Sequence, residues 1–523
     1  MKEFLQQHRQ DIMGILSGFD RLIFRGTIGQ LAHVSGMMAY LNVVGVRLKD
    51  FAGHVLAVSG RLKEGVEARV TSVGRPILYL PSSQESKENR ARAIAERDGV
   101  NEGIICLFRT LEAGASYEVH RDRVRRRIEL QARTRRCLFL YLYQVHPRVG
   151  FMHVRIQSWF PFTVQVWING REWLARQMDQ VGVGYVRAEN CFVRLQDAGR
   201  AQRLMDRQLR VNWPVLLDQL LDQIFPMRRE VFGRFSAPYY WSVYQNEWAT
   251  DVMFRDPLKL SRLYPRLVQH GIGSFSSPDV MRFLGRRINL QRGIDPRFKG
   301  EIVSDLKQRP EGVRIKHWVG GNSIKLYHKQ GSVLRFETTI HQPKDLKVFR
   351  TKEGQPNGPK RWLKLRRGVA DLYRRAEVCQ AINNRYAQAL ACVSSPQPSL
   401  GEIAGMLAQP LMFHGKRVRG LRAWSPDDLA LLRAVSRGEF TLTGLRNHDL
   451  CRLLYPKPAS SRQERRRRSS RVTRLLRLLR AHAILKKLPG THRYLMTKKG
   501  RRYITPFLLA SDATSEQLNR LAA

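Results

Sequence analysis

Positively charged side chains gather around one tyrosine and one glutamate in the segment 312–340. GVRIKHW, NSIKLYHK and SVLRFETTI are predicted to be strands of a β-meander, because glycine-containing turns at 320–322 and 330–332 separate them. Side chains alternate between the two faces of a strand, so one face is predicted to be apolar and the other polar. The predicted apolar face holds Val313, Ile315, Ile324, Leu326, Leu334, Phe336 and Ile340. The predicted polar face holds Arg314, Lys316, Lys325, Tyr327, Lys329, Arg335, Glu337 and Thr339.

This polar face has the residue types needed for phosphate chemistry. Guanidinium and ammonium groups neutralise phosphates, so nucleic-acid contacts are predicted for Arg314, Lys316 and Arg335. Tyr327 could be a nucleophile whose phenolate is stabilised by the positive charges of Lys325 and Lys329. The alternative is a sheet surface that binds phosphate and catalyses nothing.

Carboxylates near the meander could hold a divalent metal ion. Glu337 lies on the polar face, Glu247 and Asp251 lie in the segment YQNEWATD, and Asp305 lies in SDLKQRPEG. Hard cations prefer oxygen ligands, so Mg²⁺ or Mn²⁺ is the predicted cofactor, held by Glu337, Glu247 and Asp251. The same acids are candidate catalytic residues.

The segment 425–510 is predicted to form three helices, a β-hairpin and a further helix. The third helix, which ends at His482, has apolar residues at core spacing: Val472, Leu475, Leu476 and Leu479. Arginines occupy the rest of this helix and the position just before it: Arg467, Arg471, Arg474, Arg477 and Arg480. The hairpin carries His492 and Arg493, and Lys498 follows it. A helix with one apolar and one cationic side fits the major groove of DNA.

This order of elements, together with the segment KKLPGTHRYLMTKKGRR, resembles the winged helix of MarR- and ArsR-type regulators. In those families the third helix reads the groove and the wing touches the backbone. The resemblance therefore implies groove contacts for Arg471, Arg474 and Arg477 and backbone contacts for His492 and Arg493. The alternative is a winged helix that binds protein and has a solvated basic face.

The chain is predicted to be an α+β protein of several domains, with mixed sheets followed by a C-terminal winged helix. An N-terminal α+β domain is expected at 1–235 and a central domain of meander plus long helix at 236–393. A linker is expected at 394–399 and the winged-helix domain at 400–523. The long helix, 367–391, has an apolar side that could pack within its own domain or form a homodimer. The N-terminal strands are expected at 103–108, 116–121, 126–130, 136–143, 152–157 and 164–168, and the helices at 87–97, 171–180 and 199–208.

The chain of 523 residues has 91 Lys and Arg against 44 Asp and Glu, a net charge of +47. An excess of this size predicts a polyanionic partner, with DNA expected first and RNA as the alternative. The longest apolar run, 137–143, is too short to cross a membrane, and the N-terminus has no signal peptide pattern. The cysteines form no C-x-x-C pair, so neither a zinc ribbon nor a disulfide scaffold is expected. A cytoplasmic, nucleoid-associated bacterial protein is expected.

Two further resemblances concern the whole chain and its centre. The Tyr-x-Lys strand followed by LRFET resembles the palm of rolling-circle replication initiators and phage replication proteins. The two-histidine metal motif of such nucleases is absent, because His153 has no histidine two residues away. The whole chain resembles an uncharacterised bacterial family often present in several copies per genome, through FPFTVQVWINGREWLARQ, ATDVMFRD, LRFETTI and LRAHAILKKLPGTHRY. Multiple copies imply a mobile element.

Two functions follow from these patterns. The first is a mobile-element or replication-type protein that binds DNA through the winged helix and nicks or transfers strands on the central sheet. The second is a non-catalytic protein, either a DNA-binding regulator or a partner of a structured RNA. Size favours the first function, because a simple repressor seldom needs so many further basic residues.

Overall fold

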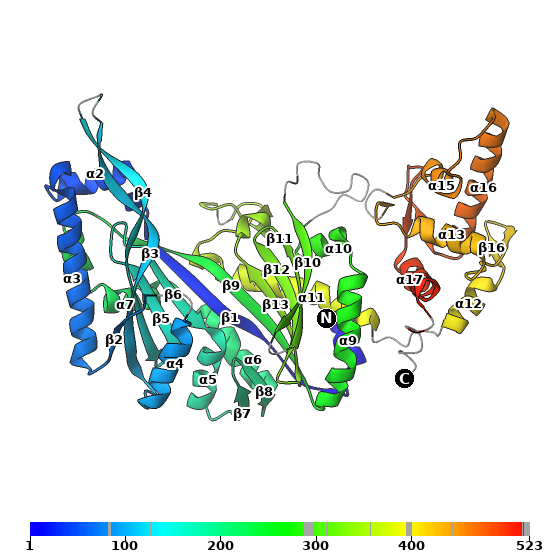
Figure 1. The fold of residues 1–523 in the computed structure, drawn as a ribbon. Helices are drawn as coiled ribbons and strands as arrows, with labels where there is room; N and C mark the ends of the chain where they lie inside the picture. Colours follow the sequence, from blue (N-terminus) through cyan, green and yellow to red (C-terminus); the bar gives the residue numbers. More distant parts are fainter. Residues whose placement is uncertain are drawn as a thin grey trace. The chain divides into compact units, whose positions relative to one another are not determined.

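The computed structural model describes the chain except residues 82–84, 123, 125–126, 287–297, 299, 310–311, 356, 394–399, 441–443, 515 and 517–523. The described residues divide into two compact units. Unit 1 comprises Met1–Val268 and Ser304–Gln388, and unit 2 comprises Gln269–Val303 and Ala389–Ala523. Helices and strands both contribute throughout, which confirms the α+β class (Figure 1). The predicted linker at 394–399 lies outside the described residues.

Unit 1 is built on one mixed sheet of 11 strands. Neighbouring strands from β11 to β3 pair antiparallel, and β2 pairs parallel with β3. In spatial order the strands are β10 (Ile302–Arg309), β11 (Gly312–Val319), β12 (Asn322–Lys329), β13 (Val333–Ile340), β9 (Tyr239–Phe254), β1 (Ile12–Ile28), β6 (Val164–Asn169), β5 (Gly150–Gln157), β4 (Arg127–His146), β3 (Gly103–Asp122) and β2 (Ile77–Tyr79).

The strand predictions succeeded where hydrophobic alternation is regular. The meander forms β11, β12 and β13, and its predicted apolar residues Ile315, Leu326 and Phe336 are fully buried. The short strands expected at 103–108 and 116–121 belong to one long strand, β3, and those expected at 126–130 and 136–143 belong to β4. Strand β1 was not predicted, because glycines and charged residues interrupt its apolar pattern.

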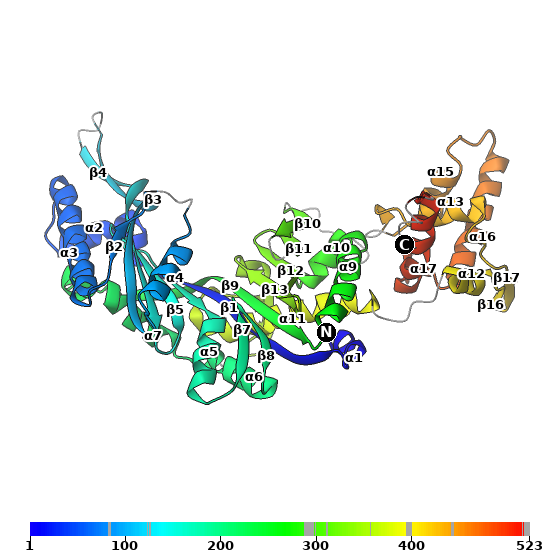
Figure 2. The same ribbon diagram turned by 60° about the horizontal axis from the view of Figure 1, so that its bottom comes forward.

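Helices cover both faces of this sheet. The polar face of the meander continues across β9 and β1, where α5 and α6 cover part of it (Figure 2). On the opposite face, Asn383 of α11 donates to the carbonyl oxygens of Trp248 and Phe336. The helices of unit 1 are α1 (Lys2–Gln7), α2 (Val34–Val43), α3 (Phe51–Ser72), α4 (Lys87–Arg97), α5 (Gly170–Gln180), α6 (Ala198–Asp206), α7 (Trp213–Ile224), α8 (Arg228–Phe232) and α11 (Leu372–Leu390), and α9 (Pro257–Gly273) begins in it. Two hairpins complete unit 1, β7 (Tyr185–Ala188) with β8 (Cys191–Leu195) and β14 (Lys347–Arg350) with β15 (Arg361–Lys364).

The predicted domain boundary near residue 235 is wrong. Strand β1 from the N-terminal region pairs along its length with β9 from the predicted central domain. A single hydrophobic core joins residues from both regions, among them Phe24 and Val333. A boundary does lie near residue 389, close to the predicted end of the central domain.

The long helix predicted at 367–391 forms as α11, and its apolar side faces its own unit. Leu372, Cys379, Ile382 and Tyr386 are buried. The apolar side therefore packs within the chain, the first of the two alternatives, and a homodimer through this buried side is not supported.

Unit 2 contains the C-terminal elements and α10 (Ser277–Phe283). Its other helices are α12 (Leu400–Ala408), α13 (Pro426–Val435), α15 (Asn447–Leu454), α16 (Arg462–Ala481) and α17 (Lys498–Asp512). Its hairpins are β16 (Leu411–Phe413) with β17 (Lys416–Val418) and β18 (Leu485–Lys487) with β19 (Tyr494–Met496). Among all described residues, every helix is too short or too polar to span a bilayer.

Candidate active site and nucleic-acid interface

An irregularity in β1 brings a buried acid onto the polar face of the sheet. Phe19 pairs with Trp248 of β9, but Arg21 pairs with the adjacent Glu247, so Asp20 is the extra residue of a β-bulge. Phe19 lies on the α11 side, where its ring centroid is 4.9 Å from that of Trp248. A bulge changes the alternation of side chains along a strand. Asp20 and Arg21 therefore both lie on the same face as Glu247.

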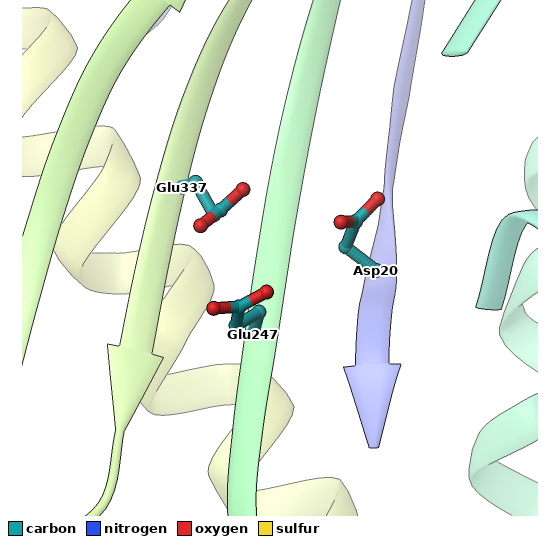
Figure 3. Close-up of side chains that lie close together, drawn as sticks. All are labelled: Asp20, Glu247 and Glu337. Carbon is teal, nitrogen blue, oxygen red and sulfur yellow. The ribbon is translucent and has the colours of Figure 1, made fainter. Parts of the chain in front are cut away.

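Three buried carboxylates meet on this face. Asp20 of β1, Glu247 of β9 and Glu337 of β13 each place a carboxylate oxygen within 4.8 Å of the others. They project from three neighbouring strands, on the side opposite α11 (Figure 3). Two of the three were predicted as metal ligands, whereas Asp20 was not. We call Asp20, Glu247 and Glu337 the carboxylate triad.

Lys325 of β12 connects two members of the triad. Its ammonium nitrogen lies 2.5 Å from Glu337 Oε1 and 3.4 Å from Glu247 Oε1. Burial opposes ionisation of Glu337, but Lys325 and Arg335 outweigh it and lower the pKa of Glu337 to about 2. Burial and the neighbouring negative charge of Glu337 raise the pKa of Glu247. The two glutamates therefore differ in their readiness to accept a proton, as a pair of crowded carboxylates must.

A second group of charges lies directly beside the triad. Arg335 donates from Nε to Asp251 Oδ1 at 2.6 Å and from Nη1 to Asp20 Oδ1 at 3.0 Å. Arg171 of α5 donates from Nη2 to Asp251 Oδ2 at 2.9 Å. Burial alone would raise the pKa of Asp251, but Arg335 and Arg171 hold it below its usual value. The two arginines thus hold Asp251 in its ionised form within the protein interior, and Arg335 also pairs with Asp20.

Local structure explains how Arg171 and the β7–β8 turn reach this group. Asn169 caps α5 by accepting from the backbone N–H groups of the first helical turn. A Cβ atom on Gly170 would lie 1.7 Å from the carbonyl oxygen of Phe19, so only glycine lets α5 begin against β1. Asn190, in the turn between β7 and β8, donates to both oxygens of Asp20 at 3.1 Å.

The surroundings of Tyr327 do not favour the nucleophilic role predicted for it. Its hydroxyl donates to Glu337 Oε2 at 2.5 Å. Burial, together with the negative charge of Glu337, raises the pKa of Tyr327 well above its usual value. The positive charge of Arg335 favours a phenolate, but burial and Glu337 outweigh it, and Lys325 is paired with carboxylates. Tyr327 is a neutral hydrogen-bond donor that orients Glu337.

Two further predictions on this face need correction. Arg335 was predicted to bind phosphate, but it is fully buried and already paired with two carboxylates. Asp251 was predicted to hold metal, but Arg335 and Arg171 occupy both of its oxygens. Asp20 takes the place in the triad that was predicted for Asp251.

The remaining cations of the meander lie nearer the solvent. Arg314, Lys316 and Lys329 are all partly exposed. The ammonium of Lys316 lies 4.9 Å from the ring centroid of Trp318. Their predicted contacts with phosphate stay predictions. Asp305, the other acid considered as a ligand, pairs with Lys307 on β10, at the edge of the sheet and away from the triad.

In unit 2, α16 begins earlier than predicted and presents different residues on each side. Val472, Leu476 and Leu479 are buried in the core of the unit. Arg467, Arg471 and Arg474 are exposed and follow one another at helical spacing on another side. His492 and Lys498, near the β18–β19 hairpin, are also exposed, whereas Arg493 is partly buried.

Arg477 and Arg480 are placed differently from the other α16 arginines. Arg477 donates from Nη2 to the carbonyl oxygen of Phe413 at 3.2 Å, and the Arg480 guanidinium lies 5.2 Å from the Phe413 ring centroid. Both line a pocket beside the β16–β17 hairpin. The groove contact predicted for Arg477 by resemblance is therefore not supported by its position.

The sequence contained one signal for the residue that was missed. Asp20 is an acid next to Arg21 within a stretch with several large apolar residues, SGFDRLIF, and such an acid in a strand is buried only when it is paired. Arg171 and Asn190 gave no comparable signal, because their partners are far away in the chain. No protein-family model matches this chain, and no curated protein or solved structure is significantly similar to it.

Proposed function

We propose that this chain is a nucleic-acid-binding protein that contacts duplex DNA through α16. The observation that carries the proposal is the exposed row Arg467, Arg471 and Arg474, which we call the arginine row. Val472, Leu476 and Leu479 anchor the helix to its unit on another side. The row can therefore meet phosphates and base edges without disturbing the core. The net charge of +47 supports a polyanionic partner.

The surrounding elements support a winged-helix interpretation of this part of unit 2. Helices α13, α15 and α16 precede the β18–β19 hairpin, and Leu445 forms an additional β-bridge with Tyr494 of that hairpin. A third strand position beside a hairpin is typical of such modules. In this proposal α16 lies in the groove, and His492 and Lys498 approach the backbone beside it.

A salt titration of the full-length protein tests this function. We expect the affinity for a duplex of about 20 base pairs to fall as the salt concentration rises. If about six phosphates are contacted, a plot of the logarithm of the binding constant against the logarithm of the salt concentration should have a slope of about −5. Fluorescence anisotropy with labelled duplex DNA, single-stranded DNA and structured RNA gives the slope and the preference. Tighter, selective binding of the RNA would contradict the DNA assignment, and no binding to any of them would contradict the function.

A second candidate function is metal-dependent cleavage of phosphodiester bonds at the carboxylate triad. Three buried oxygen donors from adjacent strands are the ligand type that Mg²⁺ and Mn²⁺ prefer. Bound metal would act as a Lewis acid toward a phosphoryl oxygen. Asp20, Glu247 and Glu337 would hold it, in competition with Lys325 for the two glutamates and with Arg335 and Asn190 for the oxygens of Asp20.

Glu247→Gln is the sharpest variant for this candidate. The pKa of Glu247 is raised, so Glu247 loses its charge more easily than Glu337 does. The fold should therefore tolerate the neutral glutamine side chain at this position. We expect wild-type protein to bind Mn²⁺, measured by electron paramagnetic resonance, and to nick supercoiled DNA. Glu247→Gln should weaken Mn²⁺ binding about tenfold or more.

The matched control is Asp305→Asn, which removes a carboxylate at the sheet edge. This control should bind Mn²⁺ as the wild type does. Equal Mn²⁺ affinity in Glu247→Gln and wild type, or no binding by wild type at millimolar metal, would rule out the metal site.

A further inference from the structure

A cationic pocket lies where α16 meets the β16–β17 hairpin in unit 2. Its volume is about 330 Å³, which is within the size range of small-ligand sites, about 300–1,000 Å³. It is lined by Phe413, His414, Lys416, Thr473, Arg477, Arg480 and Tyr494. Residues from the hairpin, from α16 and from β19 therefore converge, and no acidic residue lines the pocket.

The cations of this pocket lack the ion pairs that neutralise others on the same helix. Arg468 pairs with Glu464, and Arg471 lies 3.9 Å from Asp427. Within the described part of the chain, by contrast, no carboxylate pairs with Lys416, Arg477 or Arg480. Like charges held together without acids favour an anionic ligand.

The hairpin is built to hold these groups in place. His414 and Gly415 both have positive φ, 50° and 70°, as a two-residue turn of the tightest hairpin type requires. This turn pairs Phe413 with Lys416. The backbone carbonyl of Phe413 accepts a hydrogen bond from Arg477, and the aromatic ring of Phe413 packs against the guanidinium of Arg480. Both guanidinium groups are therefore oriented before any ligand binds. Orientation in advance lowers the entropy cost of binding.

The pocket also contains the rings needed to recognise a base. Tyr494 and His414 line it, together with the cations. We propose that this pocket binds one nucleotide, with its phosphate on Lys416, Arg477 and Arg480 and its base against Tyr494 or His414. Stacking on aromatic side chains is the common way to hold an unpaired base. The inference deepens the proposed DNA-binding function, because the ligand is either a free nucleotide or an unpaired nucleotide of a strand.

Lys416→Met tests the pocket without threatening the fold, because Lys416 is exposed on a hairpin edge. The probes are adenosine monophosphate, a 5′-phosphorylated pentathymidylate and inorganic phosphate, each titrated calorimetrically into full-length protein. We expect the nucleotide and the oligonucleotide to bind, and Lys416→Met to weaken both about tenfold. Tighter binding of the oligonucleotide than of the free nucleotide would identify a strand as the source, and the reverse would identify the free nucleotide.

The control is Arg417→Met, which removes the next cation of the same hairpin without touching the pocket. It should leave nucleotide affinity within about twofold of wild type. The proposal is overturned if neither nucleotide probe binds, if Lys416→Met binds as wild type does, or if inorganic phosphate binds as tightly as the nucleotide. Binding of duplex DNA, measured in parallel, distinguishes the two proposals. It should persist in Lys416→Met. If the protein binds the nucleotide but not the duplex, the proposal for the arginine row is wrong and the proposal for the pocket stands.

Discussion

Replacing Arg467, Arg471 and Arg474 together by alanine is expected to lower affinity for duplex DNA about a hundredfold near 0.1 M salt. Each arginine removed takes away one phosphate contact and the counterion release that accompanies it. The log–log salt slope should therefore become shallower by about 2.7, since each contact contributes about 0.9. The fold should persist, because these side chains are exposed and the helix is anchored by its buried apolar side.

Fluorescence anisotropy over a salt series measures both quantities on the full-length variant. The matched control removes three exposed arginines from unit 1, Arg69, Arg255 and Arg262, and so makes the same change in net charge. If binding depended only on net charge, both triple variants would lose affinity equally, and the arginine row would have no special role. An unchanged slope in the first variant would refute the row as the contact surface.

Replacing Arg335 by methionine is expected to destabilise unit 1 by about 3–5 kcal/mol. Arg335 is fully buried and pairs with Asp20 and Asp251, so its loss leaves two carboxylates in the interior with less compensation. Methionine fills part of the space but donates no hydrogen bond. Urea unfolding followed by circular dichroism measures the change. Lys329→Met, which removes a partly exposed cation from the same face, should cost less than about 1 kcal/mol.

The effect of Arg335→Met should depend on pH in a defined direction. The folded-state pKa of Asp251 lies below its usual value because of Arg335 and Arg171, although burial opposes this. Such a carboxylate stabilises the fold above its unfolded pKa, about 3.9, and that contribution is lost as pH falls through the depressed folded value. The difference in stability between wild type and variant should therefore shrink below about pH 4. A difference that stayed constant from neutral to acid pH would show that lost packing, rather than lost charge pairing, causes the destabilisation.

The buried charges serve the triad as well as stability. Arg335 contacts Asp20 directly, and Tyr327 and Lys325 both contact Glu337. Three carboxylates within 4.8 Å of one another repel, so cations and donors on the surrounding strands must hold them. Around Arg335 and Glu337 the polar face of the meander is thus an interior site with paired charges, whereas Arg314, Lys316 and Lys329 lie nearer the solvent.

Sequence alone determined the features that depend on neighbouring residues. Alternation of apolar and polar residues in the meander predicted three strands and their faces, and Ile324, Leu334 and Ile340 are buried as expected. Helix α4 occupies Lys87–Arg97, the predicted range, because Ser86 provides a local cap. The α+β class and the cationic helix that ends at Ala481 follow from similarly local patterns, whereas the start of that helix at Arg462 was not predicted.

The tertiary structure decided which of these residues meet. Asp20 and Arg335 are 315 residues apart in the chain, and no local pattern links them. Their contact requires β1 to pair with β9 and β9 with β13, and it requires the bulge at Asp20 to turn that side chain toward the polar face. Strand order and bulges are set by long-range pairing and by burial summed over the whole sheet, so a window of sequence does not contain them. For the same reason Lys416 and Arg477 meet in one pocket although they lie far apart in the chain.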